Sequence, residues 1–281
     1  MRNAVRIAST MALGLALAGG GTPLHERDAM GQAGVRHAQA WLGVELDPTR
    51  GETRGARVRH AVRGSPSWNA GLRDGDVILR IEDVTTLGAD DVIREISGRA
   101  PGTVVRIAVL RSGAEMPFTA TLGALPDGDE VLRLDKVGVP APSWKGLARV
   151  TGPLPVAIGD LRGRVVVVDF WATWCMACRM SAPKLSSWQA KFGAQGLSVI
   201  GITDDPVPEA SLGAQTFGMK YAAIGTDPTY TTQRAFGVRA LPTVFVIDKR
   251  GVIRDVSVGF DPRKESEMEA LLLRLLAEPA P

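Results

Sequence analysis

The feature that most constrains the fold is a pair of cysteines placed directly after an apolar run. The chain has 281 residues and only two cysteines, Cys175 and Cys178. The apolar run before them, Val165–Phe170, is interrupted only by Asp169, which is typical of a strand buried on both faces. Apolar residues then recur at the spacing of a helix face as far as Phe192. The cysteines therefore stand where a buried strand passes into a helix.

This position favours a reactive thiolate. The first backbone N–H groups of a helix have no partner within the helix, and the helix dipole adds partial positive charge there. Lowering a thiol pKa from ~8.5 to ~7 raises the thiolate fraction at neutral pH from about 3% to about half. Because the thiolate is the species that attacks a disulfide, Cys175 is the predicted nucleophile. Cys178, one turn further along, is predicted to resolve the mixed disulfide.

Other uses of the cysteine pair are weaker interpretations. A static disulfide closing so short a loop contributes only ~1.9 kcal/mol in the chain-entropy model. Two cysteines cannot supply a four-ligand zinc site, and the histidines, His25, His37 and His60, all precede residue 61. Arg179 follows Cys178, so the C-x-x-C-H haem motif is absent from the sequence. We therefore expect no metal and no dissociable cofactor, since the cysteine pair would itself be the redox centre.

The N-terminal sequence predicts export. Residues 1–21 contain two arginines, an apolar stretch over Ile7–Ala18 and an A-x-A cleavage pattern, in the order of a secretory signal peptide. The protein is expected to be periplasmic, or membrane-tethered if this leader stays uncleaved. Residues 22–39 are interpreted as a spacer, and no later stretch offers ~18 uninterrupted apolar residues. The net charge of +3 is too small to indicate a nucleic-acid partner.

Composition shifts divide the remaining chain into two domains joined by a linker. At ~150 residues per domain, the length also suggests two. Residues 40–123 alternate short β-type runs with Gly, Pro and Asp turns, around one helical stretch at Ala89–Ile96. Residues 124–142 are rich in Pro, Gly and charge and are interpreted as the linker. From residue 143 to 281, strands and helices alternate. The fold class predicted is a mainly-β domain followed by an α/β domain with a mixed sheet flanked by helices.

Further strands are predicted in both halves from local patterns, and one further helix is predicted in the second half. In the second half, the final helix is expected to have Asp261 as N-cap and Pro262 at its first position. The strands predicted are Trp41–Leu46, Ala56–Val62, Asp76–Ile81, Thr103–Arg111, Met116–Leu122, Leu197–Ile202, Thr243–Ile247 and Val252–Val258.

The segment Val168–Cys178, VDFWATWCMAC, resembles the active-site segment of thioredoxins and, more closely, that of the exported TlpA/ResA-type thiol–disulfide oxidoreductases. Leu241-Pro242-Thr243 resembles the cis-proline loop of that family. Residues 197–239 are similar to the central insertion of the TlpA-like branch. The pattern around Cys175 differs from the P-x-x-x-T/S-x-x-C context of peroxiredoxins.

The resemblance implies roles for several residues. Pro242 would face the cysteines in the cis form and help to hold the substrate backbone. Asp169 matches the buried aspartate of thioredoxins, which helps to move the proton of the resolving cysteine, although many TlpA-like members carry another residue there. A hydrogen bond to local backbone is the alternative role for Asp169. The substrate surface would consist of Trp174, Met176, Ala177, Leu241 and Thr243.

Residues 40–123 resemble a bacterial PDZ domain. The pattern rests on GSPS at 64–67, AGL at 70–72 and GDVI at 75–78, and Trp41-Leu42-Gly43-Val44 is similar to the carboxylate-binding loop. Such a loop binds a peptide C-terminus, while the peptide adds a strand at a sheet edge. The predicted peptide-binding residues are Leu42, Gly43, Val44, Val92 and Ile96. The alternative is a docking domain that binds no free terminus.

Together these features predict an exported enzyme that reduces disulfides of protein substrates, with the PDZ-like domain recruiting a substrate or partner. With no third cysteine, the pair needs an external thiol partner, and the family resemblance favours a membrane-bound one. Two alternatives stay open. One is a non-catalytic PDZ adaptor or redox-sensing binding protein. The other is a disulfide oxidant or isomerase, because Met176-Ala177 between the cysteines carries no charge that decides the reduction potential.

Overall fold

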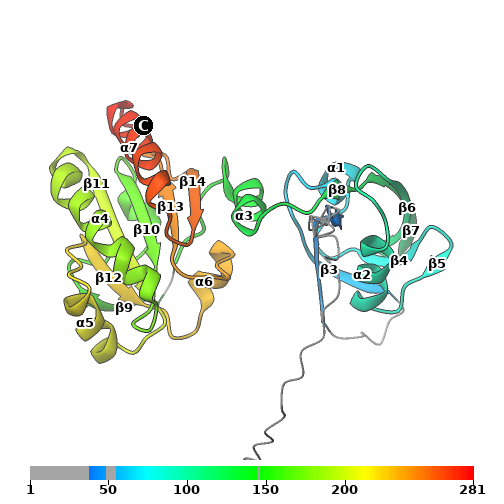
Figure 1. Ribbon diagram of the computed structural model, residues 1–281, viewed down its shortest axis with the longest axis horizontal. Helices are drawn as coiled ribbons and strands as arrows, with labels where there is room; N and C mark the ends of the chain where they lie inside the picture. The colour runs from blue at the N-terminus through cyan, green and yellow to red at the C-terminus, as the bar shows by residue number, and fades with distance from the viewer. Residues whose placement is uncertain (1–37, 49–54, 145) are drawn as a thin grey trace, which may run out of the picture. The chain divides into compact units, whose positions relative to one another are not determined.

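The computed structural model describes residues 38–48, 55–144 and 146–281 (Figure 1). The predicted leader, residues 1–21, and nearly all of the predicted spacer lie outside the described residues. Within the described ranges, no helix is long and apolar enough to cross a bilayer.

The first domain is built on an antiparallel sheet with strand order β2-β3-β4-β6-β7, with β5 pairing to β4. A separate short ladder joins β1 to β8. Its helices are α1 (Pro66–Ala70) and α2 (Ala89–Ser97). The strands are β1 (Ala40–Trp41), β2 (Val44–Leu46), β3 (Ala56–Ala61), β4 (Val77–Ile81), β5 (Val84–Thr85), β6 (Val104–Arg111), β7 (Ala114–Thr121) and β8 (Gly123–Ala124).

The predicted strand Trp41–Leu46 is split in the structure. Gly43 has a φ of +82°, a left-handed conformation that favours glycine and ends regular strand geometry. A Cβ at Gly43 would lie 2.2 Å from the Cβ of Ser65, so the packing leaves no room for a side chain at this position. The two strands on either side of Gly43 consequently pair with different partners: β1 pairs with β8, and β2 pairs with β3.

The segment predicted as a linker contains a helix, α3 (Gly128–Lys136). Its Leu132 packs against the core cluster that contains Phe236 and Ile253, and Arg133 forms an ion pair with Asp255. A nine-residue helix is marginal in isolation and is stabilised by such tertiary contacts, which explains why the local pattern did not predict it.

The second domain has a mixed sheet with strand order β14-β13-β10-β11-β12-β9. β10, β11 and β12 run parallel, while β13, β14 and β9 each pair antiparallel with their neighbours. The strands are β9 (Ala148–Thr151), β10 (Val165–Phe170), β11 (Leu197–Thr203), β12 (Ala223–Thr226), β13 (Thr243–Ile247) and β14 (Ile253–Val258). The helices are η1 (Ile158–Leu161), α4 (Met176–Phe192), η2 (Gly193–Gln195), α5 (Val207–Thr216), α6 (Thr231–Phe236), η3 (Pro262–Lys264) and α7 (Glu265–Ala277).

Both faces of this sheet are covered, as the apolar strand pattern predicts. Val165 and Val167 of β10 face the cluster made with α4 and α7, while Val166 and Val168 face the cluster that includes Phe236 of α6. Because side chains alternate along a strand, Asp169 follows Val165 and Val167 onto the α4 face. The fold class predicted from sequence is confirmed. The start of the final helix differs from the prediction: Asp261 caps the 3₁₀ turn η3, and α7 begins only at Glu265.

Candidate active site

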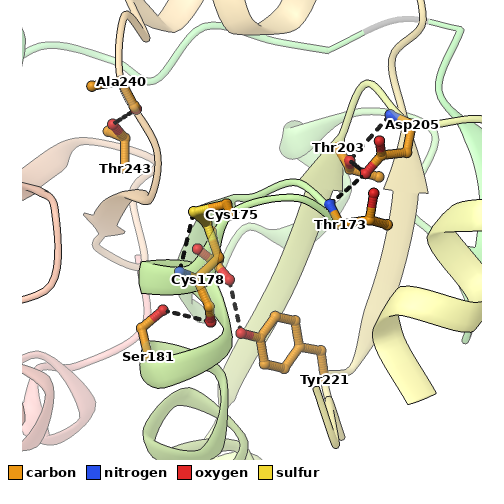
Figure 2. The surroundings of a disulfide bond; sticks show 10 residues. Thr173, Cys175, Cys178, Ser181, Thr203, Asp205, Tyr221, Ala240 and Thr243 are labelled. Atoms are coloured by element: carbon orange, nitrogen blue, oxygen red, sulfur yellow. Dashed lines mark hydrogen bonds between the residues drawn. A yellow bond between two sulfur atoms is a disulfide. The ribbon is translucent and has the colours of Figure 1, made fainter. Parts of the chain in front are cut away.

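The two cysteines form a disulfide at the start of α4 (Figure 2). Cys175 is the N-cap residue, and the backbone N–H of Cys178 donates to the Cys175 Sγ over 3.1 Å. This donor is one of the unpaired N–H groups of a helix N-terminus, so it would stabilise a Cys175 thiolate in the reduced protein. Cys175 is 5% exposed and Cys178 is fully buried. An attacking reagent therefore meets Cys175 first.

Asp169 lies at the end of β10 with its side chain fully buried. Burial raises the pKa of Asp169 to about 7, because the charged form loses its hydration, while a hydrogen bond from Tyr221 acts in the opposite direction. The Tyr221 hydroxyl donates to Asp169 Oδ2 over 2.7 Å. A carboxyl group that titrates near neutral pH can accept and release a proton under working conditions.

The loop between β10 and α4 is fixed by an aspartate from another part of the chain. Asp205 accepts hydrogen bonds through Oδ2 from the backbone N–H of Thr173, at 2.7 Å, and from the Thr203 hydroxyl, at 2.9 Å (Figure 2). These bonds tie the residues just before Cys175 to the carboxyl end of β11. The nucleophile is thereby held on a rigid support rather than on a free loop.

The peptide bond between Leu241 and Pro242 is cis, as the motif predicts. Leu241 packs against the cluster that contains both cysteines, so the loop and the disulfide belong to one site. Thr243 begins β13, and its hydroxyl donates to the Ala240 carbonyl over 2.7 Å. The Pro242 carbonyl accepts from the backbone N–H of Gly259.

An exposed apolar surface surrounds the start of α4. Trp174 is 74% exposed and Met176 is 67% exposed, and Met180 one turn further along is also exposed. Large apolar side chains at such exposure next to a reactive group are typical of a docking surface. Ala177, also predicted for this surface, is half-buried against the cysteine cluster. Trp171 differs from Trp174, because it is fully buried in the same cluster as the two cysteines.

Three of the predicted peptide-binding residues, Leu42, Gly43 and Val44, lie just before or at the start of β2, an edge strand of the sheet. In the described part of the chain, β2 pairs with β3 on one side and with no strand on the other. The carbonyl of Gly43 accepts from the hydroxyls of Ser65 and Ser67, which fixes the turn before β2. Leu42 is buried in the core, and Val44 at the start of β2 packs against it.

The α2 residues predicted to bind the peptide, Val92 and Ile96, are both buried in that same core cluster. Their neighbour Ile93 is instead 58% exposed on the same helix. The structure therefore places the apolar face of α2 in the core, and it leaves the backbone edge of β2 as the element that a peptide could pair with.

No group of three or more histidine, cysteine or acidic side chains within the described residues could hold a metal ion. The redox-competent group of this site is the disulfide itself.

The sequence predicted Cys175, Cys178, Asp169 and Pro242, and the structure brings them to one end of the sheet. The sequence did not predict that Tyr221 or Asp205 belongs to the site. Each reaches the site from a distant part of the chain, and no local motif marks either residue. The register of the sheet offers the only signal for Tyr221, because Gly201 stands opposite Asp169 and leaves space for a ring.

The fold and the site define a thioredoxin-like domain preceded by a PDZ domain. The Redoxin family model matches residues 136–272, and the PDZ domain model matches residues 40–122. The chain is 34% identical over 125 residues to the thiol:disulfide interchange protein DsbE of Pseudomonas fluorescens, which covers 44% of this chain and 67% of that protein. The chain belongs to the thioredoxin-like thiol–disulfide oxidoreductase family.

Two further relatives are similar over somewhat more than half of the chain. Thiol-disulfide oxidoreductase ResA of Bacillus thuringiensis is 27% identical over 167 residues, which cover 58% of this chain and 90% of that protein. Protein DipZ of Mycobacterium bovis is 30% identical over 167 residues, or 56% of this chain. The match spans only 24% of the length of DipZ.

Proposed function

We propose that this protein catalyses thiol–disulfide exchange on protein substrates and acts as a reductant. The observation that supports this most directly is the position of Cys175. It is the N-cap of α4, it accepts a backbone hydrogen bond, and it is the more accessible of two cysteines that already form a disulfide. In the reduced protein the Cys175 thiolate attacks a substrate disulfide, and Cys178 then releases the substrate.

Asp169 serves as the proton acceptor for Cys178 in this scheme. It is buried on the α4 face of the sheet, and its pKa of about 7 suits proton transfer near neutral pH. The cis-Pro242 loop, with Leu241 and Thr243, holds the backbone of the substrate. Trp174, Met176 and Ala177 provide the apolar contact surface for a protein rather than for a small thiol.

The PDZ domain recruits a substrate or partner through its C-terminus. The open edge of β2 can add a peptide strand, and Leu42, Gly43 and Val44 form the loop that meets the terminal carboxylate. Val92 and Ile96 shape the adjacent helix from within the core. Binding of a peptide with a free C-terminus, compared with the same peptide amidated, tests this role, and equal binding of both would contradict it.

The protein works outside the cytoplasm and receives electrons from an external thiol partner, which we place in the membrane. The chain has no cysteine beyond the active pair, so thiol exchange within the chain cannot regenerate the dithiol. The basic, apolar and small-residue regions of residues 1–21 support export.

Insulin reduction by two matched variants tests the exchange reaction. Cys175→Ser should show neither turnover nor a covalent adduct. Cys178→Ser should lose turnover but accumulate a mixed disulfide with the substrate, because the attacking thiol remains and the resolving thiol is gone. Equal turnover of wild type and Cys175→Ser would sink the proposal. Equilibration with glutathione then gives the reduction potential of the cysteine pair, which decides whether the protein reduces or oxidises its substrates. A reduction potential near about −120 mV would indicate an oxidant instead.

A further inference from the structure

The carboxyl group of Asp169 is held asymmetrically. Its Oδ2 accepts the hydrogen bond from the Tyr221 hydroxyl, whereas its Oδ1 is buried and has no hydrogen-bond partner. A buried carboxylate oxygen without a partner is costly, and such an atom in a native site needs an explanation. The two oxygens are therefore held differently: Oδ2 is fixed by a hydrogen bond, and Oδ1 is left free to make one.

The space for Tyr221 comes from a glycine on the neighbouring strand. Asp169 of β10 pairs with Gly201 of β11. A Cβ at Gly201 would lie 3.1 Å from Tyr221 Cδ2 and 3.1 Å from Trp171 Nε1. Any side chain there would compete with the tyrosine ring for the space beside Asp169.

Tyr221 approaches the cysteines from a segment that is itself anchored. It lies just before β12, where the next residue, Ala222, donates its backbone N–H to the Val199 carbonyl over 2.9 Å. The ring packs against the cluster that contains Cys175 and Cys178. Figure 2 shows the Tyr221 side chain pointing toward the first turn of α4.

We propose that Tyr221, seated over Gly201, is a positioning residue that orients Asp169 for proton transfer from Cys178. This inference rests on the proposed role of Asp169. Tyr221 fixes Oδ2 and favours the carboxylate form, so that Oδ1 is presented as the base.

In the reducing direction, Cys178 resolves the mixed disulfide between Cys175 and the substrate. After Cys175 has formed a mixed disulfide, the Cys178 thiol gives its proton to Asp169 Oδ1, and its sulfur electron pair forms the bond to Cys175 Sγ. The bond between Cys175 and the substrate sulfur breaks, and the substrate leaves as a thiolate. The enzyme dithiol is oxidised by two electrons, and the substrate disulfide is reduced by the same two.

Tyr221→Phe is the direct test, because it removes the hydroxyl and keeps the ring. The measurement is the pH profile of resolution, followed as the decay of the mixed disulfide in rapid-mixing experiments. A charge-assisted hydrogen bond favours the ionised form by roughly tenfold, so the midpoint of the profile should move up by about one pH unit. The rate at pH 6.5 should fall by roughly the same factor, while the rate at high pH should be unchanged.

Gly201→Ala gives a second, independent variant. It keeps the tyrosine hydroxyl and should shift the profile in the same direction, because the new methyl group pushes the ring away from Asp169. If Tyr221→Phe fails to fold, this variant carries the test alone. Circular dichroism and formation of the Cys175 adduct at the wild-type rate establish that either variant is folded.

Asp169→Asn distinguishes the role of Asp169 from the role of Tyr221. If it leaves the pH profile of resolution unchanged, the proposed role of Asp169 fails. If Asp169→Asn flattens the profile but Tyr221→Phe and Gly201→Ala behave as wild type, only the role of Tyr221 is overturned. In the double variant, Tyr221→Phe should add no further loss to Asp169→Asn. An additive loss would show that the tyrosine acts independently of the aspartate.

Discussion

Asp169→Asn should stabilise the protein in a strongly pH-dependent way. In the folded protein the pKa of Asp169 is raised from 3.8 to about 7 by burial. Between these two values the folded state holds a proton that the unfolded state has released. The free energy of unfolding of the wild type therefore decreases as pH rises from about 4 to about 7, and the loss is complete above pH 7.

The size of the effect follows from the shift in pKa. A difference of about three pKa units corresponds to about 4 kcal/mol, at 1.36 kcal/mol per unit. Asparagine has a similar volume, carries no charge and still accepts the hydrogen bond from Tyr221. The advantage of the variant over wild type should therefore grow by about 3 kcal/mol between pH 5 and pH 8.5.

The assay is urea denaturation of the full-length oxidised proteins at several pH values. Two domains can give two transitions, so a Leu72→Ala control, in the core of the PDZ domain, identifies the transition that belongs to that domain. The stabilisation by Asp169→Asn should appear only in the other transition. Parallel stability profiles of wild type and variant across this pH range would refute the assignment of Asp169 as a buried group that titrates near neutrality.

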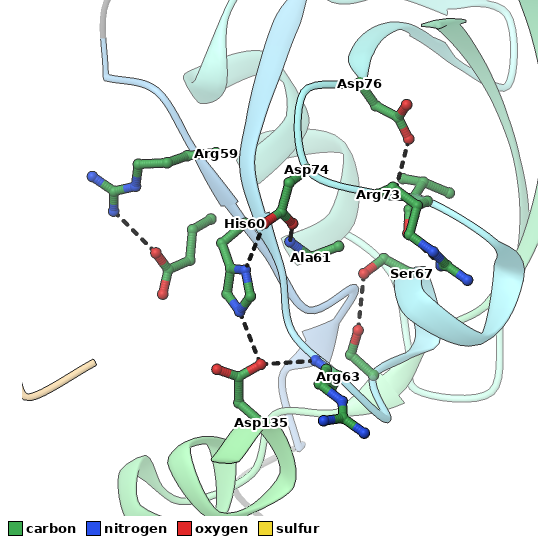
Figure 3. Close-up of polar contacts among 12 residues, drawn as sticks. Arg59, His60, Ala61, Arg63, Ser67, Arg73, Asp74, Asp76 and Asp135 are labelled. Carbon is green, nitrogen blue, oxygen red and sulfur yellow. Dashed lines mark hydrogen bonds and ion pairs between the residues drawn. The ribbon is translucent and has the colours of Figure 1, made fainter. Parts of the chain in front are cut away.

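Three further outcomes are expected. His60 contacts Asp74 at 3.1 Å and Asp135 at 2.8 Å (Figure 3), and the hydrogen bond to Asp135 is the main cause of its raised pKa. Its stabilising contribution is therefore present below pH 6.5 and lost as pH rises through the folded pKa. His60→Gln should remove this pH dependence of the free energy of unfolding, measured by urea denaturation at several pH values. An unchanged pH dependence would contradict the ion pair between His60 and the two aspartates. Gly43→Ala should destabilise the PDZ domain by at least about 1–2 kcal/mol, because alanine is strained at positive φ and would also clash with Ser65, and a urea midpoint equal to wild type would count against this. Phe245→Ala should lower the free energy of unfolding of the thioredoxin-like domain by about 3–5 kcal/mol, because it removes a fully buried ring whose centroid lies 4.9 Å from that of Phe236. A decrease below about 1 kcal/mol would show that the core collapses around the gap.

Local patterns were sufficient for the elements that carry the chemistry. A six-residue apolar strand, two cysteines at a helix start and a Leu-Pro-Thr loop each occupy one continuous stretch, so their geometry depends on neighbours in sequence. The cysteine pair and the burial of Asp169 could be predicted for this reason, whereas the cis form of Pro242 was expected from the family resemblance of its loop. Helix α3 could not, because its stability comes from contacts such as that of Leu132 with the core of the second domain.

The sequence by itself determined which groups can react: two cysteines in the chain, at the one kind of position that favours a thiolate, and a carboxyl group in a strand that must be buried. Only the tertiary structure decided how that carboxyl group is held. Tyr221 lies 52 residues from Asp169 along the chain, and the hydrogen bond between them forms because Gly201 leaves room beside the strand. Proton affinity in a buried site depends on every group within hydrogen-bonding distance, and those neighbours are assembled by the packing of strands and helices rather than by any local pattern.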